Sequence, residues 1–479
     1  MKKLVLIAFA LVFGLTIMAC DGATTAAPTT AAPTTAAPTT ASPTTGSPTT
    51  AAPTTAAPTT ATPTTEAPII VQGVTATSIK VGNAASTTGA GAGVGVPFNA
   101  GINAYFDYIN GLGGIDGRTI NFVTYDDTTN PTVGLSNTEK LIEEDEIFAL
   151  VGHFGTWTVG ATLELIQETG IPMIYAATGV NSLYFQESEG NPVMAVQPIY
   201  KTDGRIMTAR AIKESVYGAT GDQPLPSGAK IGVVYTNDDV GLSIKEGIEQ
   251  EAEILGKSAD MIYQAVTTSY ATAMLILKAS GVSAIILAMN QEPFGYALQQ
   301  MHNNSLNVPV FSSYVNADVT QVNHTLDIAA RPIFVNAWLD LLDPEGVSGL
   351  SQEYWDYYTV MISGDYAAYA LNNYAIAGYM AAYIFVEGLK RVETADVPLT
   401  WANYIAQMES AVLDIPMGGE VDWTNGKRWG ISEMSLLKYS YGYGDNPLTT
   451  DVVETDYLLE TFGKVREIQS IEEIEGTIE

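Results

Sequence analysis

Side chains that carry covalent or metal chemistry are scarce in this sequence. Its 479 residues include one cysteine, Cys20, and three histidines, His153, His302 and His324, which do not pair at metal-ligand spacing. A single thiol allows neither an intramolecular disulfide nor a multi-thiolate metal site. The sequence also contains no Gly-x-Ser-x-Gly nucleophile elbow. We therefore expect no metal, no cofactor and no covalent catalysis.

Two local patterns imitate cofactor or catalytic motifs. The glycine-rich run 89–95 follows a predicted strand and precedes a predicted helix, but none of its reading frames completes Gly-x-Gly-x-x-Gly. We interpret this run as a flexible loop that faces a ligand. Asp126 and Asp127 are adjacent at the end of a predicted strand, so their side chains point to opposite sides. We expect both carboxylates to shape loops rather than to catalyse.

The thiol of Cys20 has a specific context. A basic start precedes an apolar run over 4–18, the pattern of a cleaved export signal. This run is short for a bilayer crossing, which takes about 20 apolar residues. Residues 17–20, Ile-Met-Ala-Cys, resemble a bacterial lipobox, in which the chain is cut before a cysteine that then carries lipid. We predict a signal peptide over 1–19 and a membrane anchor at Cys20; the alternative is an ordinary signal peptide with a chance cysteine.

A low-complexity segment follows. Residues 26–65 form eight consecutive pentapeptides, mostly Ala-Ala-Pro-Thr-Thr. Proline every fifth residue disfavours helix and sheet and favours an extended polyproline-like chain, which at about 3.1 Å per residue would span on the order of 120 Å. Dense threonine with proline is also typical of O-glycosylated stalks. We interpret residues 20–76 as a tether.

Charge and size limit the rest of the chain. Lys and Arg number 21 against 52 Asp and Glu, a net charge of −31, which disfavours nucleic acid and anionic lipid as partners. The hydrophobic fraction of 46% is that of a folded protein. The roughly 400 residues after the tether are too many for one compact core and fit two lobes.

Strand and helix patterns alternate after residue 77. The predicted strands are 79–82, 119–125, 147–151, 172–176, 230–235, 261–265, 282–289 and 308–312. The predicted helices are 97–111, 131–144, 157–169, 203–217, 240–255, one from 270, and 293–303. This alternation predicts parallel sheets covered on both faces. The apolar stretch 365–390 carries Asn372, Asn373 and five tyrosines, so we expect a buried core helix rather than a membrane span.

Five segments in this order resemble the type I periplasmic binding proteins of branched-chain amino acid ABC importers, the leucine/isoleucine/valine-binding group. They are 79–82 with Thr88-Gly89, 111–118, 125–127, 151–153 and 171–178. The resemblance is dense in the first lobe and continues more weakly to about Tyr439.

The resemblance implies an α/β fold of two doubly wound parallel-sheet lobes joined by a three-crossing hinge. We place the crossings near 198–200, 335–338 and 428–431. Lobe one then comprises 77–199 and 337–430, and lobe two comprises 200–336 and 431–479.

The resemblance also implies ligand contacts. Thr156 opens a predicted helix and falls where the family places a hydroxyl on the ligand carboxylate, at a helix end that favours anions; the alternative role is an N-cap. Ala176 and Thr178 match the family's Ala-x-Thr, whose backbone carbonyl takes the ligand amine and whose hydroxyl orients the head group. Trp157 has no family counterpart and either covers the ligand or packs.

Other positions of the expected site depart from the family. The aromatic lids fall near residues that are not aromatic here, Val94, Val240 and Asn290. The glutamate that pairs with the ligand ammonium falls near Tyr314 or Val315, neither of which is acidic, although Asp318 and the pair 238–239 are available substitutes. A buried ammonium without a carboxylate would cost several kcal/mol. The ligand therefore stays open.

The resemblance implies a non-catalytic receptor that closes on a small amino acid-like ligand and delivers it to an ABC permease. The same fold could instead bind an amide, urea or an aromatic acid, or act as a sensor for a signalling partner. An enzyme is the third class, which turnover would distinguish from simple binding.

We predict that Cys20→Ala yields a soluble or uncleaved product, because no thiol is left to acylate. Membrane fractionation and intact-mass analysis of the native protein check this prediction. An unmodified cysteine in the mature chain would contradict the anchor.

Overall fold

A computed structural model describes residues 71–476, except 186–187, 267–268, 323–325, 327–329, 342–349 and 445–456. Residues Ala67–Glu479 form one compact unit. The predicted signal peptide, Cys20 and the tether up to residue 70 lie outside the described residues.

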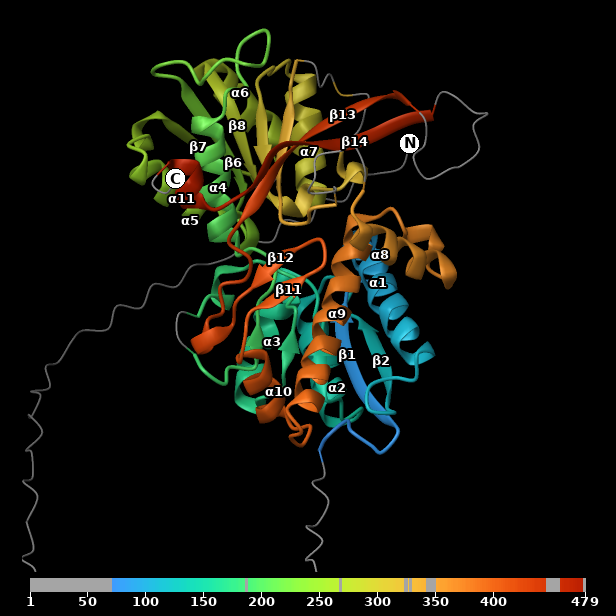
Figure 1. Ribbon diagram of the computed structural model, residues 1–479. Helices are drawn as coiled ribbons and strands as arrows, with labels where there is room; N and C mark the ends of the chain where they lie inside the picture. The colour runs from blue at the N-terminus through green and yellow to red at the C-terminus, as the bar shows by residue number, and fades with distance from the viewer. Residues whose placement is uncertain are drawn as a thin grey trace, which may run out of the picture. The chain divides into compact units, whose positions relative to one another are not determined.

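The first sheet has five parallel strands in the order β2-β1-β3-β4-β5 (Figure 1). Its strands are β1 (Ser78–Ala85), β2 (Thr119–Asp126), β3 (Ala149–Val151), β4 (Met173–Ile174) and β5 (Val193–Met194). The helices that connect successive strands of this sheet are α1 (Ala92–Gly111), α2 (Pro131–Glu143) and α3 (Thr156–Thr169). Because parallel crossovers are right-handed, α1, which leads outward from β1 to β2, and α2, which leads back to β3, lie on opposite faces.

The second sheet has seven strands in the order β14-β13-β10-β9-β8-β6-β7. Its strands are β6 (Lys230–Thr236), β7 (Met261–Val266), β8 (Val282–Ala288), β9 (Val310–Ser312), β10 (Ile333–Ala337), β13 (Met434–Gly444) and β14 (Tyr457–Gln469). The helices that belong with it are α4 (Tyr200–Lys213), α5 (Asp239–Ile254), α6 (Tyr270–Ser280) and α7 (Gln291–Asn303). Strands β6 to β10 are parallel, whereas β13 runs antiparallel to both β10 and β14.

The remaining elements follow β10 in the chain. They are α8 (Gln352–Ser363), α9 (Asn373–Thr394), α10 (Trp401–Met408), the β11 (Leu413–Ile415) and β12 (Gly419–Val421) pair, and the short α11 (Ile471–Glu475). The chain thus passes between the two sheets after β5, after β10 and before β13. The lobe boundaries drawn from the sequence stay predictions.

The structure confirms an α/β fold with two sheets and corrects four details. The helix predicted over 97–111 begins at Ala92, so Pro97 lies inside α1 and residues 92–95 of the glycine-rich run are helical rather than a loop. The second sheet is mixed rather than parallel, because the C-terminal segment adds the antiparallel hairpin β13–β14. The helix predicted over 203–217 spans 200–213, since Glu214 takes an extended backbone. The stretch 365–390 is broken: α9 begins at Asn373, where the Asn372 side chain caps the backbone N–H groups of the first turn.

Helices α1 and α9 lie side by side on the first sheet (Figure 1). Two glycines allow this approach. A Cβ on Gly378 would lie 1.8 Å from the Phe98 carbonyl oxygen, and a Cβ on Gly101 would lie 1.9 Å from that of Ala375. The glycines therefore bring two backbones into direct contact and fix the position of Phe98.

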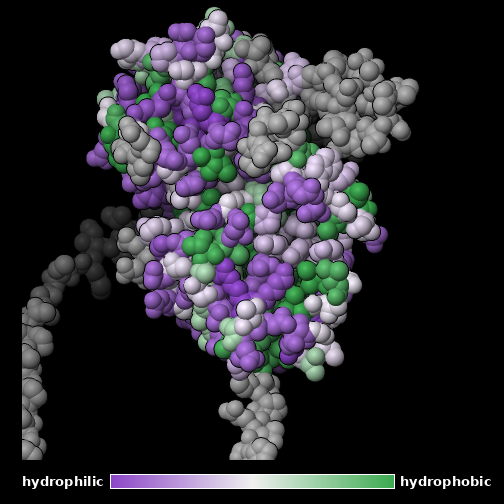
Figure 2. All heavy atoms as spheres, in the orientation of Figure 1, coloured by the Kyte–Doolittle hydropathy of each residue, from purple (hydrophilic) through white to green (hydrophobic). Residues whose placement is uncertain are grey.

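The visible face of the molecule shows hydrophobic residues dispersed among hydrophilic ones (Figure 2). Among the helices that the structure describes, none has the length and apolar character needed to cross a membrane.

We expect Gly378→Ala to lower the free energy of unfolding by about 3 kcal/mol or more, because α1 and α9 must separate to admit the methyl group. Gly160→Ala is the matched control: this helical glycine of α3 has open space around its Cβ position. The control should be neutral or stabilising by up to about 1 kcal/mol. Denaturant unfolding of both variants checks the prediction, and equal stability would contradict the close contact.

Candidate ligand-binding site

A cavity of about 580 Å³ lies where strands of both sheets end. From the first sheet it takes residues that follow the carboxyl ends of β1 to β5, and from the second sheet residues that follow β6, β8, β9 and β10. The first turns of α9, together with β13 and β14, complete the lining. Parallel sheets bind ligands outside the carboxyl ends of their strands, so this cavity is the candidate site.

Asp127 ties the loops of the first-sheet wall together. Its carboxylate is fully buried and accepts hydrogen bonds from the Ser86 hydroxyl at 2.6 Å, the Thr129 backbone N–H at 2.8 Å and the Thr158 hydroxyl at 2.6 Å. These three partners follow β1, β2 and β3, and all of them line the cavity. Asp126 accepts from the backbone N–H groups of Thr87 and Thr88 instead. Both carboxylates shape loops.

The N-terminus of α3 forms the polar end of this wall. Gly155 precedes the helix with a φ of 89°, and Thr156 is the first helical residue. The Thr156 hydroxyl lies 2.7 Å from that of Thr178 and 3.5 Å from that of Tyr200. The unpaired N–H groups of a first helical turn attract an anionic group. This end of the cavity can therefore hold a carboxylate.

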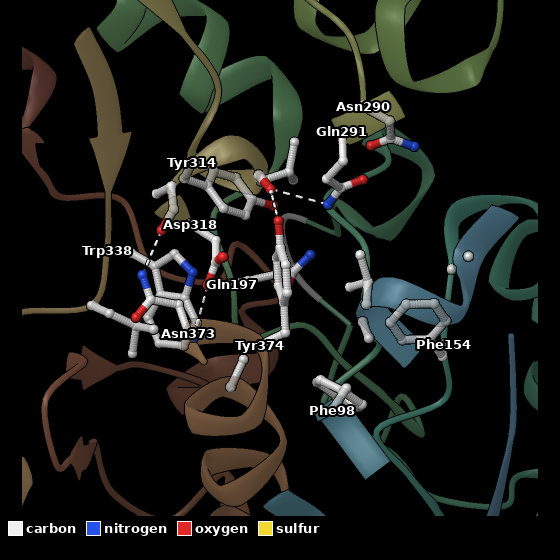
Figure 3. A pocket seen from close by; sticks show the side chains of 18 of the residues that line it. Phe98, Phe154, Gln197, Asn290, Gln291, Tyr314, Asp318, Trp338, Asn373 and Tyr374 are labelled. Atoms are coloured by element: carbon white, nitrogen blue, oxygen red, sulfur yellow. Dashed lines mark hydrogen bonds between the residues drawn. The ribbon is translucent and has the colours of Figure 1, made fainter. Parts of the chain in front are cut away.

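Four aromatic rings line the cavity in a row, three of them beside the first sheet and the fourth, Trp338, after β10 of the second. Phe154 and Phe98 have ring centroids 5.5 Å apart, Phe98 and Tyr175 5.8 Å, and Tyr175 and Trp338 6.3 Å. We call these four residues the aromatic row. Tyr314 from the second sheet adds a further ring (Figure 3).

The charges of the lining are mostly negative. Asp238, Glu292, Asp318 and Asp340 line the cavity, and the one lysine or arginine among the described lining residues is Lys464. The Lys464 ammonium lies 2.8 Å from Asp340 and 2.9 Å from Glu467, so nearby carboxylates neutralise it. The second-sheet wall consequently favours a positive group on a ligand.

The loop after β9 is bound to the N-terminus of α9. Asp318 accepts from the Asn373 backbone N–H at 3.0 Å. The Tyr374 hydroxyl and the Gln291 amide both donate to the Val315 carbonyl, at 3.1 and 3.0 Å (Figure 3). These bonds fix the loop after β9 against α7 and α9 at one wall of the cavity.

The sequence of this chain matches a known family along most of the folded region. The profile of the family described as periplasmic binding protein matches residues 78–443. The chain belongs to the periplasmic binding protein family. This family consists of extracytoplasmic binding proteins rather than enzymes, as the sequence predicted.

Individual relatives of this periplasmic binding protein are distant. It is 22% identical over 232 residues to an amino acid binding protein of Pseudomonas aeruginosa, covering 48% of this chain and 58% of the relative. It is 22% identical over 268 residues to a Leu/Ile/Val-binding protein homologue of Brucella abortus, covering 55% and 67%. The chain thus spans 58% of the length of the first relative and 67% of the length of the second.

A solved structure shares the fold. A branched-chain amino acid ABC transporter protein from Thermus thermophilus, solved with bound valine, matches with a TM-score of 0.64 and 16% identity, covering 85% of this chain and 99% of that one. At this identity the likeness shows the fold alone.

The predicted ligand contacts fall into two groups. Thr156, Trp157, Asn290 and Tyr314 line the cavity of this periplasmic binding protein. Ala176, Thr178 and Val240 are buried and do not line it. Ala176 and Val240 pack in hydrophobic clusters, and the Thr178 hydroxyl lies behind Thr156, to which it is hydrogen-bonded.

Sequence reasoning missed most of the aromatic lining. The expected lid positions Val94, Val240 and Asn290 hold no ring, but rings reach the cavity from elsewhere: Phe98, Phe154, Tyr175, Tyr200, Trp338 and Tyr374. Trp338 ends a predicted hinge crossing, and Phe98 lies in α1 three residues after the glycine-rich run. The sequence positions of Trp338 and Phe98 were the signals from which these two rings could have been assigned to the site.

Asp203 lies outside the cavity lining, in the same helical turn as the lining residue Tyr200. It lies in the first turn of α4, is fully buried, and accepts a hydrogen bond from the Asn336 amide at 2.7 Å. Burial raises the pKa of the Asp203 carboxyl to about 7. A raised carboxyl pKa means that the folded state binds the proton more tightly than the unfolded chain does. The preferential protonation of Asp203 in the folded state therefore adds to the free energy of unfolding at low pH. This stabilisation is lost as pH rises from about 4 to about 7.

We predict that Asp203→Asn raises the melting temperature at pH 8 more than at pH 5, because asparagine keeps the acceptor but carries no charge. At pH 8 the substitution should raise the free energy of unfolding by a few kcal/mol, since one pKa unit corresponds to about 1.4 kcal/mol. Thermal unfolding at both pH values measures it, with the exposed Asp116→Asn as control. A pH-independent difference would contradict the buried charge.

Proposed function

We propose that this periplasmic binding protein is the solute-binding component of an ABC importer and takes a small amino acid-like ligand into the cavity. The ligand carboxylate would lie at the N-terminus of α3 beside Thr156. The ammonium would face the acidic second-sheet wall, where Asp318 and Asp238 replace the glutamate of the family. The protein would be held at the outer face of the membrane by lipid on Cys20, with the tether between anchor and fold, and would deliver its ligand to a permease.

One observation carries this proposal. A helix N-terminus without a charged side chain and a wall of carboxylates both line one cavity between strand ends. Opposite charges on the two walls match the two charges of an amino acid. The names of the relatives, an amino acid binding protein and a Leu/Ile/Val-binding homologue, support the same class.

The lobes proposed from the sequence, 77–199 with 337–430 and 200–336 with 431–479, fit this function. The proposed lining of the ligand comes from both, so closure about the three crossings would enclose it. The closed form would be the one that docks on the permease.

A second candidate is an acid without an ammonium, as in the aromatic acids. Asp318 supports it, because three of the roughly four acceptor positions of this carboxylate are already filled. Oδ1 accepts from the backbone N–H and the hydroxyl of Thr320, and Oδ2 accepts from the Asn373 N–H. Little capacity is left for an ammonium at this residue.

Calorimetry separates the two candidates. Phenylalanine and 3-phenylpropanoate share the ring and the carboxylate and differ in the ammonium. The proposal predicts tighter binding of phenylalanine, and tighter binding of 3-phenylpropanoate would transfer the function to the second candidate.

We expect Thr156→Ala to weaken binding of the tighter ligand by about tenfold or more, because a hydrogen bond to a charged group contributes about 1.5–3 kcal/mol. Thr178→Ala should weaken it less, since Thr178 acts through the Thr156 hydroxyl. Thr132→Ala, at an exposed position of α2, is the matched control. Unchanged affinity in Thr156→Ala would contradict the placement of the carboxylate.

A further inference from the structure

We infer that this cleft selects a solute whose apolar body is aromatic, larger than the side chain of a branched-chain amino acid, and that Trp338 is the residue that selects it. This inference rests on the proposed function and names the ligand class within it.

The size of the cavity is the first argument. Its volume of about 580 Å³ lies within the roughly 300–1,000 Å³ of sites that enclose drug-sized ligands. Closely packed interiors leave few voids larger than a water molecule. A small aliphatic side chain would leave much of this volume unfilled, whereas a ring system would fill more of it.

The aromatic row is the second argument. Its neighbouring centroids lie 5.5 to 6.3 Å apart, within the 4.5–7 Å of attractive aromatic pairs. The row leads from Phe154, beside the N-terminus of α3, to Trp338 after β10. A ligand with its carboxylate at α3 therefore lays its body along ring surfaces.

The hydrogen bonds of the tyrosines are the third argument. The Tyr314 hydroxyl donates to the Pro198 carbonyl at 2.8 Å, and that of Tyr374 donates to the Val315 carbonyl at 3.1 Å. The Tyr175 hydroxyl points to Gln197 at 3.4 Å. Because their donors are used within the protein, these side chains offer the ligand mainly carbon surface.

The residues that follow Trp338 in the chain contribute an aliphatic part of the lining. Leu339, Leu341 and Leu350 belong to it, and β14 contributes Lys464, which is paired with Asp340. No lysine or arginine among the described lining residues is free to hold a second anionic group there. The part of the ligand that lies there thus carries no second anionic group, and Trp338 is the ring next to this lining in the chain.

The test is a ligand series with one head group. Alanine, valine, leucine, phenylalanine and tryptophan carry the same carboxylate and ammonium and differ in the apolar body alone. Isothermal titration of the wild-type protein should give phenylalanine or tryptophan at least about tenfold tighter than valine and leucine, since each added buried methylene strengthens binding roughly fourfold.

Trp338→Leu tests the assigned residue. Leucine keeps an apolar side chain but removes the ring, so phenylalanine should bind about five- to tenfold more weakly while alanine affinity changes by less than about twofold. The matched control is Tyr296→Ala, an aromatic residue that is 55% exposed and outside the lining. The ratio of the phenylalanine and alanine affinities is independent of the folded fraction. If Trp338→Leu does not fold, Trp338→Phe replaces it, and its smaller ring should weaken tryptophan binding more than alanine binding.

The outcomes are separable. Valine or leucine binding as tightly as phenylalanine would overturn the inference and leave the proposed function intact. Tight phenylalanine binding that Trp338→Leu does not change would overturn the role of Trp338. If no member of the series binds but 3-phenylpropanoate does, the proposed function fails and the aromatic body of the ligand stands. If neither binds, the proposed function and the inference fail together.

Discussion

The candidate site depends on one buried carboxylate. Asp127 is fully buried and joins the loops after β1 and β2 to the first turn of α3, which follows β3. A buried carboxylate is tolerated only when hydrogen bonds satisfy it, so these three segments are held at fixed positions around Asp127. The wall that presents the N-terminus of α3 and the start of the aromatic row rests on this arrangement.

A second constraint fixes the aromatic row from the other side. Gly101 and Gly378 let α1 and α9 touch backbone to backbone, which sets the depth of Phe98 in the cavity. The N-terminus of the same helix α9 packs against the loop after β9, where the Asn373 backbone N–H donates a hydrogen bond to Asp318. One helix thus contributes to the packing of the first sheet and to the wall formed by the second. Changes in the packing of α9 against α1 would therefore alter the geometry of the site.

Much of this architecture was predictable because it is local. Short apolar runs between turn residues gave β1 to β4 of the first sheet and β6 to β9 of the second, but not β5 or β10. Pro131 and Gly170 marked a helix start and a helix end as expected. The role of Asp126 and Asp127 as loop-shaping residues followed from their adjacency at a strand end. The long hairpin β13–β14 did not follow, because its pairing with β10 joins segments about 100 residues apart.

The site was predictable only in part. Thr156, Trp157, Asn290 and Tyr314 line the cavity because strand ends converge, which a pattern of parallel strands implies. Thr178 is adjacent in sequence to cavity-lining Ala177, but its side chain turns behind Thr156, and sequence spacing does not encode that direction. Tyr374 reaches the cavity through tertiary packing, so no local pattern identified it. The position of Trp338 at a predicted hinge crossing did not show that its ring lines the site.

Hydrogen–deuterium exchange with and without saturating phenylalanine tests the central claim most directly, namely that a small solute binds where the strand ends of both sheets meet. The account predicts slower exchange on ligand addition in the loops that line the cavity, at 86–98, 153–158, 290–293 and 314–319. Protection confined to one sheet, or located away from these loops, would contradict it.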